Sequence, residues 1–165
     1  MATFRMTHDI DCDPERFWKI FFDTQFNEKL FKSLEFTEWN VVKLTEDENS
    51  IVRIVKAVPK MDLPGPVAKL VGSGFGYDEE GRFDRATKTF KYVVKASTMA
   101  EKLRHEGVVR CEDLGNGKCR RVADIIAEAK IFGIGGMFES ALEKGYRIGW
   151  QKSADFINAY LKENP

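Results

Sequence analysis

The chain lacks the features that mark several large classes of protein. It has no apolar run of roughly 18 residues, so the sequence predicts no transmembrane helix. Its 26 basic and 26 acidic side chains cancel, so we expect no binding of nucleic acid and at most transient contact with a membrane. The opening residues 1–6 lack the apolar core of a signal peptide, and we therefore expect a cytoplasmic protein.

Cysteine is also scarce. The three cysteines, Cys12, Cys111 and Cys119, do not have the spacing of a metal site, and in a cytoplasm they are most simply reduced thiols. Segment 72–76 lacks the helix and the lysine–serine pair of a phosphate-binding loop, and segment 133–136 lacks the strand–helix–strand unit of a dinucleotide site. We therefore expect no metal and no cofactor, and no motif names a catalytic residue.

Phenylalanine, by contrast, is abundant. The chain has 13 phenylalanines beside 4 tyrosines, which indicates a core or a cavity with aromatic walls rather than a polar catalytic cleft. A length of 165 residues suffices for a sizeable core, and no internal repeat divides it, so we expect one domain over residues 1–165. We expect a monomer or a weak dimer.

The first part of the chain predicts one strand and two short helices. Residues 4–10 alternate between apolar and polar side chains, as in a strand with one buried face. Asp13 followed by Pro14 is typical of a helix start, because aspartate caps the first turn and proline suits the first helical position. An aromatic face follows over residues 17–22, and after a break a second apolar helical face extends over residues 26–34.

The middle of the chain has the two-residue period of β-strands. We expect strands over residues 36–45, 51–58, 75–84 with an interruption near Gly81, 89–97, 103–112 and 121–131. The run Gly115-Asn116-Gly117 predicts a tight hairpin, and Lys60–Pro66 breaks regular structure. With the first strand this gives about six to seven antiparallel strands, and glycines such as Gly81 and Gly107 would allow the sheet to curve.

A long amphipathic helix closes the chain. Segment 131–139 is typical of a strand end followed by a glycine-rich turn, and the helical period continues to Leu161. Gly145 and Gly149 lie on the apolar face of this helix, where each costs roughly 1 kcal/mol relative to alanine. Either they let the helix pack closely on the alanine-rich last strand, or their missing side chains leave a hollow between helix and sheet. The two alternatives are compatible, since one end can pack while the other stays open.

This order of elements resembles the START-like superfamily (SRPBCC), which includes Bet v 1-type proteins, START lipid-transfer domains and polyketide cyclase/dehydrase-like proteins. The resemblance rests on the element order, on Asp13–Trp18 after the first strand, and on the closing helix. Segments 131–139 and 150–161 are more closely similar to a bacterial branch with no assigned activity.

The resemblance implies an α+β helix-grip fold, in which a curved antiparallel sheet of about six to seven strands wraps around a long C-terminal helix and two short helices follow the first strand. It also implies a large cavity between the sheet and that helix. In the superfamily such a cavity holds an apolar ligand, for example a lipid, a sterol or an aromatic polyketide.

Candidate residues for lining this cavity come from the inward faces of the predicted strands and of the last helix. They are Phe75, Tyr77, Tyr92, Val94, Leu103, His105, Val109, Met137, Phe138, Leu142, Gly145, Tyr146 and Gly149. The apolar residues Met61, Leu63, Val67 and Leu70 suggest a lid over the cavity mouth. The alternative is a loop that packs into the core.

Three polar residues allow two interpretations each. His105 and His8 face inward by strand parity, and each is either a ligand anchor or base, or a core histidine with satisfied hydrogen bonds. Glu139 lies in the first turn of the last helix, where the helix dipole favours a carboxylate. Its alternative role is a polar anchor at the end of the cavity.

We therefore consider three functions. The leading hypothesis is a non-enzymatic protein that binds or carries a hydrophobic small molecule, lipid-like or sterol-like. The second is a cyclase- or dehydratase-like enzyme acting on an aromatic or polyketide substrate, with His105 or His8 as base and a tyrosine or Arg121 polarising a carbonyl. The third is a protein-interaction module, which a filled core or a large exposed apolar patch would favour.

Overall fold

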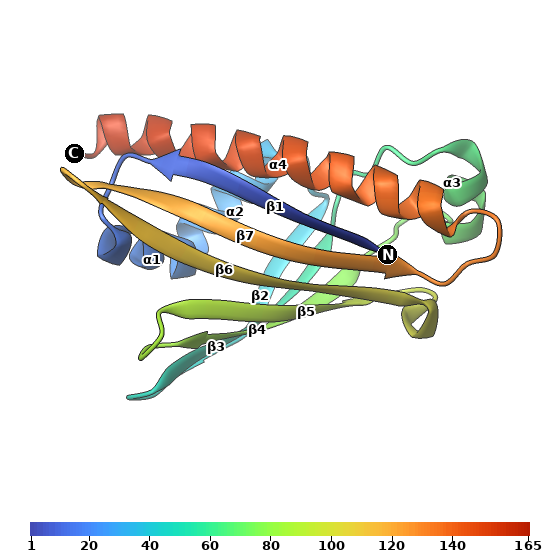
Figure 1. Cartoon of the computed structure of the whole chain (residues 1–165), viewed down its shortest axis with the longest axis horizontal. Coiled ribbons are helices and arrows are strands. Elements are labelled where there is room, and N and C mark those ends of the chain that lie inside the picture. Colours follow the sequence, from blue (N-terminus) through green and yellow to red (C-terminus); the bar gives the residue numbers. More distant parts are fainter.

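One curved antiparallel sheet forms the body of the protein. The computed structural model describes residues 1–165, and the strands pair in the order β1-β7-β6-β5-β4-β3-β2. Strands β2 to β6 each pair with the next along the chain, whereas β1 pairs with β7. The strands are β1 (Ala2–Ile10), β2 (Glu38–Glu46), β3 (Ser50–Val58), β4 (Tyr77–Asp84), β5 (Thr89–Ala96), β6 (Leu103–Gly115) and β7 (Lys118–Ala129) (Figure 1).

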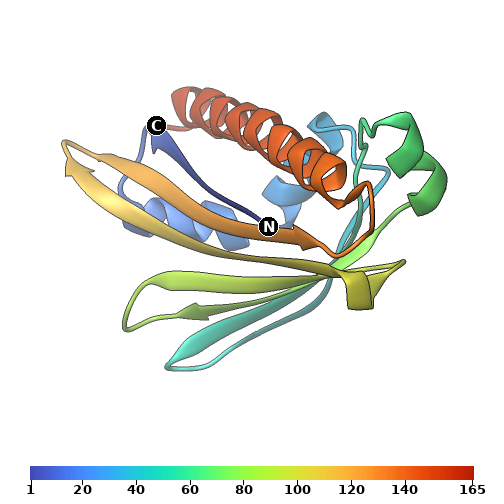
Figure 2. The same ribbon diagram turned by 45° about the vertical axis from the view of Figure 1, so that its right-hand side comes forward.

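Four α-helices and one 3-10 turn complete the fold. They are α1 (Pro14–Phe22), α2 (Thr24–Ser33), α3 (Gly65–Val71), the turn Ala100–Lys102, and α4 (Gly135–Glu163). Helix α4 lies across β1 and β7, while α1 and α2 lie behind them and α3 lies beside the start of α4 (Figures 1 and 2). None of these helices combines the length and the hydropathy that a membrane span requires. The predicted α+β architecture, with two short helices after the first strand, is confirmed.

The two short helices begin where the sequence predicts. The Asp13 carboxylate accepts a hydrogen bond of 2.8 Å from the backbone N–H of Arg16, and Pro14 occupies the first turn. Asp23 ends α1 and caps α2, accepting from the N–H of Phe26 at 2.9 Å. Each cap satisfies a donor that the helix itself leaves unpaired. Asp23 therefore determines where α1 ends and α2 begins.

Three expectations about regular structure were wrong. Strand β4 continues through Gly81 without interruption, β7 ends at Ala129 rather than at residue 131, and helix α3 starts at Gly65, inside the segment expected to be irregular. Gly81 remains in the ladder because its missing side chain makes room for the ring of Phe90, which an added Cβ would strike. Gly107 accommodates the ring of Tyr92 in the same way.

The hairpin between β6 and β7 forms at the predicted glycines. Gly115, Asn116 and Gly117 have φ angles of +75°, +55° and +71°. This left-handed backbone suits glycine and asparagine and matches the twist of the flanking strands. The hairpin fixes the register of the two longest strands.

Helix α4 is attached to the sheet near both of its ends. At its start, Gly135 approaches the backbone carbonyl of Ala129 so closely that an added Cβ would collide with it. Near its end, the Asn158 side chain accepts from the N–H of Asp11 at 2.9 Å and donates to the carbonyl of Asp9 at 3.1 Å. These contacts fix the position of both ends of the helix on the sheet.

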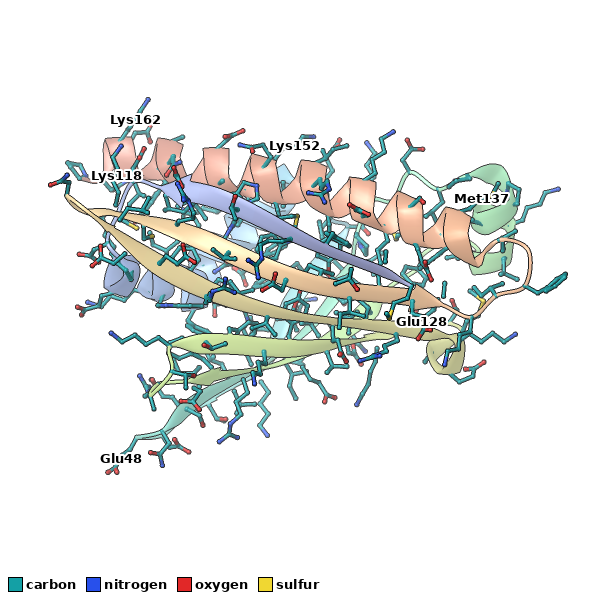
Figure 3. The ribbon with its side chains drawn as sticks, in the orientation of Figure 1. Glu48, Lys118, Glu128, Met137, Lys152 and Lys162 are labelled. Atoms are coloured by element: carbon teal, nitrogen blue, oxygen red, sulfur yellow. The ribbon has the colours of Figure 1, made fainter.

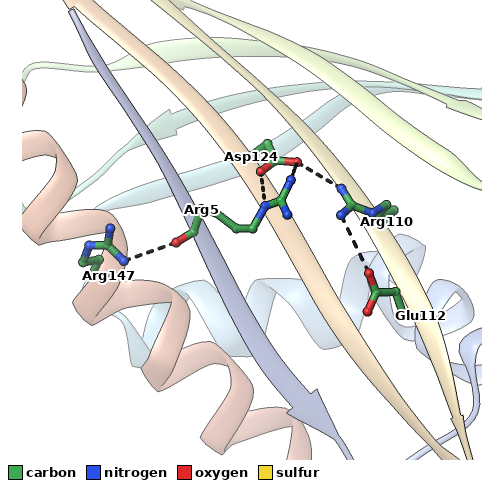
Figure 4. A network of polar contacts seen from close by, with 5 residues as sticks. All are labelled: Arg5, Arg110, Glu112, Asp124 and Arg147. Atoms are coloured by element: carbon green, nitrogen blue, oxygen red, sulfur yellow. Dashed lines mark hydrogen bonds and ion pairs between the residues drawn. The ribbon is translucent and has the colours of Figure 1, made fainter.

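A polar network ties three neighbouring strands together on the outer face of the sheet (Figure 4). Asp124 on β7 contacts Nε of Arg5 on β1 at 2.6 Å and Nη1 of Arg110 on β6 at 3.0 Å. Arg110 also reaches Glu112 at 3.7 Å, and Arg147 of α4 donates to the carbonyl of Arg5 at 3.3 Å. Because these side chains are partly exposed, each pair contributes at most about 1 kcal/mol.

Aromatic side chains of α1 pack on the inner face of the sheet. Phe17 and Trp18 are buried, and the Trp18 ring lies 4.6 Å from that of Phe83 between centroids. A smaller cluster joins α3 to the start of α4 through Val67 and Phe138. The aromatic face predicted for the first short helix is confirmed.

Candidate ligand cavity

A cavity of about 380 Å³ lies between the inner face of the sheet and α4. Its walls come from α1, α2, strands β3 to β7 and the inner side of α4, and most of the lining residues are hydrophobic. Small-molecule sites in proteins occupy about 300–1,000 Å³ and combine apolar walls with a few placed polar groups. The cavity has the size and the wall chemistry of such a site.

The glycines of α4 open onto this cavity. A Cβ added at Gly145 or Gly149 would meet no atom within 4 Å, and both residues lie on the cavity wall together with Ala141. Close packing of the helix on the sheet, one of the two interpretations of this face, occurs instead at Gly135. Gly145 is exposed to solvent, whereas Gly149 is partly buried, so the missing side chain of Gly149 in particular leaves part of the empty volume.

All but one of the predicted lining residues lie on the cavity wall. Those on the wall are Phe75, Tyr77, Tyr92, Val94, Leu103, His105, Val109, Phe138, Leu142, Gly145, Tyr146 and Gly149. The exception is Met137, which lies in the first turn of α4 with 47% of its surface exposed (Figure 3). One helical step of 100° separates it from the buried Phe138. That the residues on the wall bind a ligand stays a prediction.

The four proposed lid residues lie in three different environments. Met61 lies on the cavity wall. Val67 is buried in the small cluster beside Phe138, and Leu63 packs against that cluster. Leu70 points outward and is 46% exposed. The alternative of a loop packed into the body therefore describes Leu63 and Val67, and only Met61 is placed where a lid residue would be.

Two charged residues that sequence reasoning did not single out face the cavity. Nη2 of Arg53 on β3 lies 3.4 Å from Oε1 of Glu79 on β4, and their side chains are 7% and 19% exposed. Strand parity could have found them, because Arg53 alternates inward with Val55 and Glu79 alternates inward with Tyr77. The sequence signal for this pair was a charged residue at an inward position on each of two adjacent strands.

Arg53 is held by aromatic rings as well as by Glu79. Its Nη1 donates to the carbonyl of Phe21 at 2.7 Å, and its guanidinium carbon lies 4.7 Å from the centroid of the Phe21 ring and 5.4 Å from those of Phe22 and Phe90. Burial lowers the pKa of Arg53, and the nearby Glu79 opposes that shift. Cation–π contacts of this kind are strongest when the charge is desolvated, so the guanidinium is fixed in place.

Glu79 has unused hydrogen-bonding capacity. Its only hydrogen bond is the long contact of Oε1 with Arg53, whereas an ionised carboxylate can accept about four. Burial raises the pKa of Glu79, and Arg53 opposes that shift by stabilising the ionised form. The carboxylate is thus an acceptor that faces the cavity without a full set of donors.

Three tyrosines on the cavity wall lie around this carboxylate. Burial raises the pKa of Tyr77, Tyr92 and Tyr146 well above the ordinary value, and the charge of Glu79 adds to each shift. All three hydroxyls therefore stay protonated at neutral pH and can donate hydrogen bonds. Together with Glu79 they form a polar patch inside a largely apolar cavity, which we call the tyrosine–glutamate patch.

His105 lies at the edge of this patch. Its ring centroid is 6.1 Å from that of Tyr92 and 5.0 Å from that of Tyr146. Burial lowers the pKa of His105 to about 4, so the imidazole is neutral at pH 7. Its Nε2 is buried without a hydrogen-bond partner, and such an atom typically costs about 1–3 kcal/mol.

Arg121 joins β7 to α4 at another part of the cavity wall. It is buried, and it donates to the carbonyl of Trp150 at 2.7 Å and to Oγ of Ser153 at 2.9 Å. His8 lies against it, with Nδ1 3.2 Å from Nη2. Burial and the Arg121 charge lower the pKa of His8 to about 4. His8 does not lie on the cavity wall, so the hypothesis that it serves as a base there was wrong.

Glu139 has a structural role. Its Oε1 accepts a hydrogen bond of 2.8 Å from the backbone N–H of Ala129, and its Oε2 lies 3.0 Å from the amino group of Met1. Burial acts to raise the pKa of Glu139, but these contacts outweigh it and the net shift is downward. Glu139 is not on the cavity wall, so the interpretation as a polar ligand anchor was wrong.

The sequence matches a protein-family model over most of its length. Residues 5–161 match the model of a family described as "Protein of unknown function (DUF2505)". The chain belongs to the DUF2505 family. No curated protein matches the sequence.

Solved structures are similar to this DUF2505 protein in fold. The ZhuI aromatase/cyclase from Streptomyces sp. R1128 matches with a TM-score of 0.69 and 11% identity over 98% of this chain and 93% of that chain. A START superfamily protein from Mycobacterium smegmatis matches with 0.66 and 10% over 99% of both chains. Norcoclaurine synthase from Thalictrum flavum matches with 0.65 and 12% over 98% and 87%. At such identities the likeness shows the fold alone, and the START-like, Bet v 1-like helix-grip fold is confirmed.

Proposed function

We propose that this DUF2505 protein binds or carries a hydrophobic small molecule, lipid-like or sterol-like, in the cavity between the sheet and α4. The observation that carries the proposal is the empty face of α4 at Gly145 and Gly149, where the helix exposes backbone to a largely apolar space. A helix that needed only to pack would gain about 1 kcal/mol from alanine at each position. The glycines are therefore best explained by the volume that they leave free.

The energetics of enclosure support this function. Apolar surface removed from water contributes about 25 cal/mol per Å², so a ligand surrounded by sheet and helix gains affinity from most of its surface. The START superfamily protein and the aromatase/cyclase described above share the architecture, which supports a small molecule as the occupant. A filled interior would have favoured the hypothesis of a protein-interaction module. The observed cavity does not favour that hypothesis.

The proposal is tested first by what the purified protein contains. Native mass spectrometry followed by organic extraction should reveal an apolar molecule in stoichiometric amount. After extraction, the apo protein should bind the neutral fluorophore N-phenyl-1-naphthylamine with a rise in fluorescence. Absence of both a co-purified molecule and fluorophore binding would contradict the proposal.

A cavity-filling variant makes the second test specific. Gly149→Leu places a side chain in the empty volume and should abolish binding of the fluorophore while the protein stays folded. The matched control is Gly136→Leu, in the same helix but off the cavity wall, where an added Cβ also meets no atom within 4 Å. Equal binding by wild type and Gly149→Leu would count against the cavity as the binding site.

A second candidate function is a cyclase- or dehydratase-like enzyme acting on an aromatic or polyketide substrate in the same cavity. The observation that favours it is the neutral imidazole of His105, whose Nε2 has no partner and which lies between Tyr92 and Tyr146. Such a group can act as a general base if a substrate proton comes within reach. Turnover of an aromatic polyketide that His105→Ala abolishes, with fluorophore binding retained, would establish the enzyme over the carrier.

We also propose that the segment around Met61 gates the cavity mouth. Met61 lies on the wall, whereas Val67 anchors the following helix to the body. The expected motion is therefore a displacement of residues 59–62 rather than of the whole loop. Hydrogen exchange in those residues should slow when a ligand is added, and unchanged exchange at saturation would contradict the gate.

A further inference from the structure

The polar patch inside the cavity restricts the chemistry of the ligand. We infer that the ligand is a neutral hydroxylated hydrocarbon, an alcohol or a phenol, whose hydroxyl donates to Glu79 and accepts from Tyr77, and that Glu79 excludes the corresponding carboxylic acid. The inference rests on the proposed function, because it assumes that the cavity takes up a small molecule. It goes further in naming the functional group and the residue that selects it.

Glu79 is a hydrogen-bond acceptor with too few donors. Glu79 retains 19% of its side-chain surface although it lies deep in the molecule, so that surface faces the cavity. No hydrogen bond of the structure reaches its Oε2. A buried carboxylate without donors is costly, and a ligand O–H would form a charge-assisted hydrogen bond with it, which is stronger than one between neutral groups.

A hydrogen-bond donor lies beside this acceptor. Tyr77 lies two residues from Glu79, on the same face of β4 and on the cavity wall, and its hydroxyl stays protonated at neutral pH. A ligand hydroxyl has one proton to give and two lone pairs to receive, so it can satisfy Glu79 and one tyrosine together. A ketone or an ether could use the tyrosines but would leave Glu79 unsatisfied.

No positive charge is free at the patch to pair with a ligand anion. Arg53 is the positive partner of Glu79 and is occupied by it, by the carbonyl of Phe21 and by aromatic rings. His105 is neutral at pH 7. A ligand carboxylate would therefore meet the Glu79 carboxylate without a free counter-charge, and two like charges in a site of low dielectric repel strongly.

The test uses three molecules with one skeleton: 2-naphthol, 2-naphthoate and naphthalene. Each is measured at pH 7 by displacement of N-phenyl-1-naphthylamine from the apo protein. We expect 2-naphthol to bind at least about tenfold more tightly than either of the others, since one hydrogen bond to a charged group is worth about that factor. Naphthoate that binds as tightly as naphthol, or naphthol no tighter than naphthalene, would overturn the inference.

The variant Glu79→Gln isolates the selecting residue. It keeps the shape of the side chain and removes the charge, so Arg53 becomes available to an anion. We expect 2-naphthoate to bind about tenfold more tightly than to wild type, 2-naphthol to bind more weakly, and naphthalene to be unchanged. The matched control is Glu80→Gln, the next residue, whose carboxylate is 48% exposed and pairs with Lys95 at 3.0 Å. An equal effect of both variants on all three molecules would contradict the assigned role of Glu79.

The outcomes separate this inference from the function on which it rests. If the fluorophore binds but selectivity for naphthol is absent, the inference fails and the carrier function stands. If neither the fluorophore nor any naphthalene derivative binds, the proposed function fails and the inference with it. Melting temperatures of Glu79→Gln and Glu80→Gln confirm that each variant is folded before its binding is compared.

Discussion

The guanidinium of Arg121 lies over the indole ring of Trp150, with 4.5 Å between its Cζ and the ring centroid, and it donates to the backbone carbonyl of the same residue at 2.7 Å. No carboxylate pairs with it, and burial lowers the pKa of Arg121 to about 9. The charge is instead balanced by a ring face, a carbonyl and Oγ of Ser153. Strand β7 and the middle of α4 are thus joined by one cation.

Loss of this cation should destabilise the fold. We expect Arg121→Ala to lower the free energy of unfolding by about 2–4 kcal/mol, because it removes buried packing together with two hydrogen bonds. The neighbouring Arg120→Ala is the control, since Arg120 is 42% exposed and pairs only with Asp9, and should cost at most about 1 kcal/mol. Urea denaturation of the two variants measures the difference. Equal losses of unfolding free energy in the two variants would show that Arg121 stabilises the fold no more than an exposed ion pair does.

Acid should destabilise the protein through His105. The folded state binds the His105 proton only near pH 4, whereas the unfolded chain binds it near pH 6.5. Between these values the unfolded state holds more protons, so stability falls as the pH drops from about 6.5 to 4, by up to about 3 kcal/mol. Chemical denaturation at a series of pH values should reveal this slope.

Substitution of His105 should reduce the slope. In His105→Gln the fall in the free energy of unfolding between about pH 6.5 and 4 should be smaller than in wild type, and the part that His8 contributes should remain. The comparison variant is His8→Gln. Because burial and the Arg121 charge also lower the pKa of His8 to about 4, this variant should reduce the slope as well, and the double variant should reduce it most. An unchanged slope in His105→Gln would mean that the imidazole is not desolvated in the folded state.

Alanine at the cavity glycines should stabilise the protein. Gly145→Ala and Gly149→Ala meet no atom within 4 Å, so each should raise the free energy of unfolding by up to about 1 kcal/mol through helix propensity. Gly135→Ala, in the same helix, should lower it, because its Cβ would strike the carbonyl of Ala129. Thermal melts of the apo proteins provide the measurement. A loss of stability at Gly145 or Gly149 would show that the hollow is packed in solution.

The three cysteines should react at different rates. The thiol of Cys111 and burial raise the pKa of Cys119 to about 12, and Cys119 and burial raise the pKa of Cys12. Because the thiolate is the reactive form, we expect Ellman's reagent to modify Cys111 in the native protein and the other two only on unfolding. Mass spectrometry of the labelled peptides identifies the sites, and rapid labelling of all three would refute the buried arrangement.

Most of the fold could be predicted because its signals are local. Alternating side chains mark strands such as β5, aspartate caps mark the starts of α1 and α2, and the run Gly115-Asn116-Gly117 marks a hairpin. Strand pairing is not local, and the continuity of β4 through Gly81 depends on the ring of Phe90 from the next strand. No pattern within β4 itself carries that information.

The site was predictable in outline but not in its chemistry. Parity placed Tyr92 and His105 inward, and the spacing of Gly145 and Gly149 allowed for a hollow. The importance of Arg53 and Glu79 depends on a diagonal contact between two strands, which the sequence does not specify until the register is known. Met137 was misplaced because one helical step separates the buried from the exposed side of α4.

The pairing of β1 with β7 sets the order in which a nascent chain can fold. Strands β2 to β7 can form successive antiparallel pairs while synthesis proceeds, since each pairs with its neighbour in sequence. Strand β1 has β7 as its only partner in the sheet, and Ala2 pairs with Ala127 near the end of β7. Contacts between residues so far apart in sequence slow folding. The first strand made is therefore the last that can join the sheet, because its partner β7 is the last strand to be made.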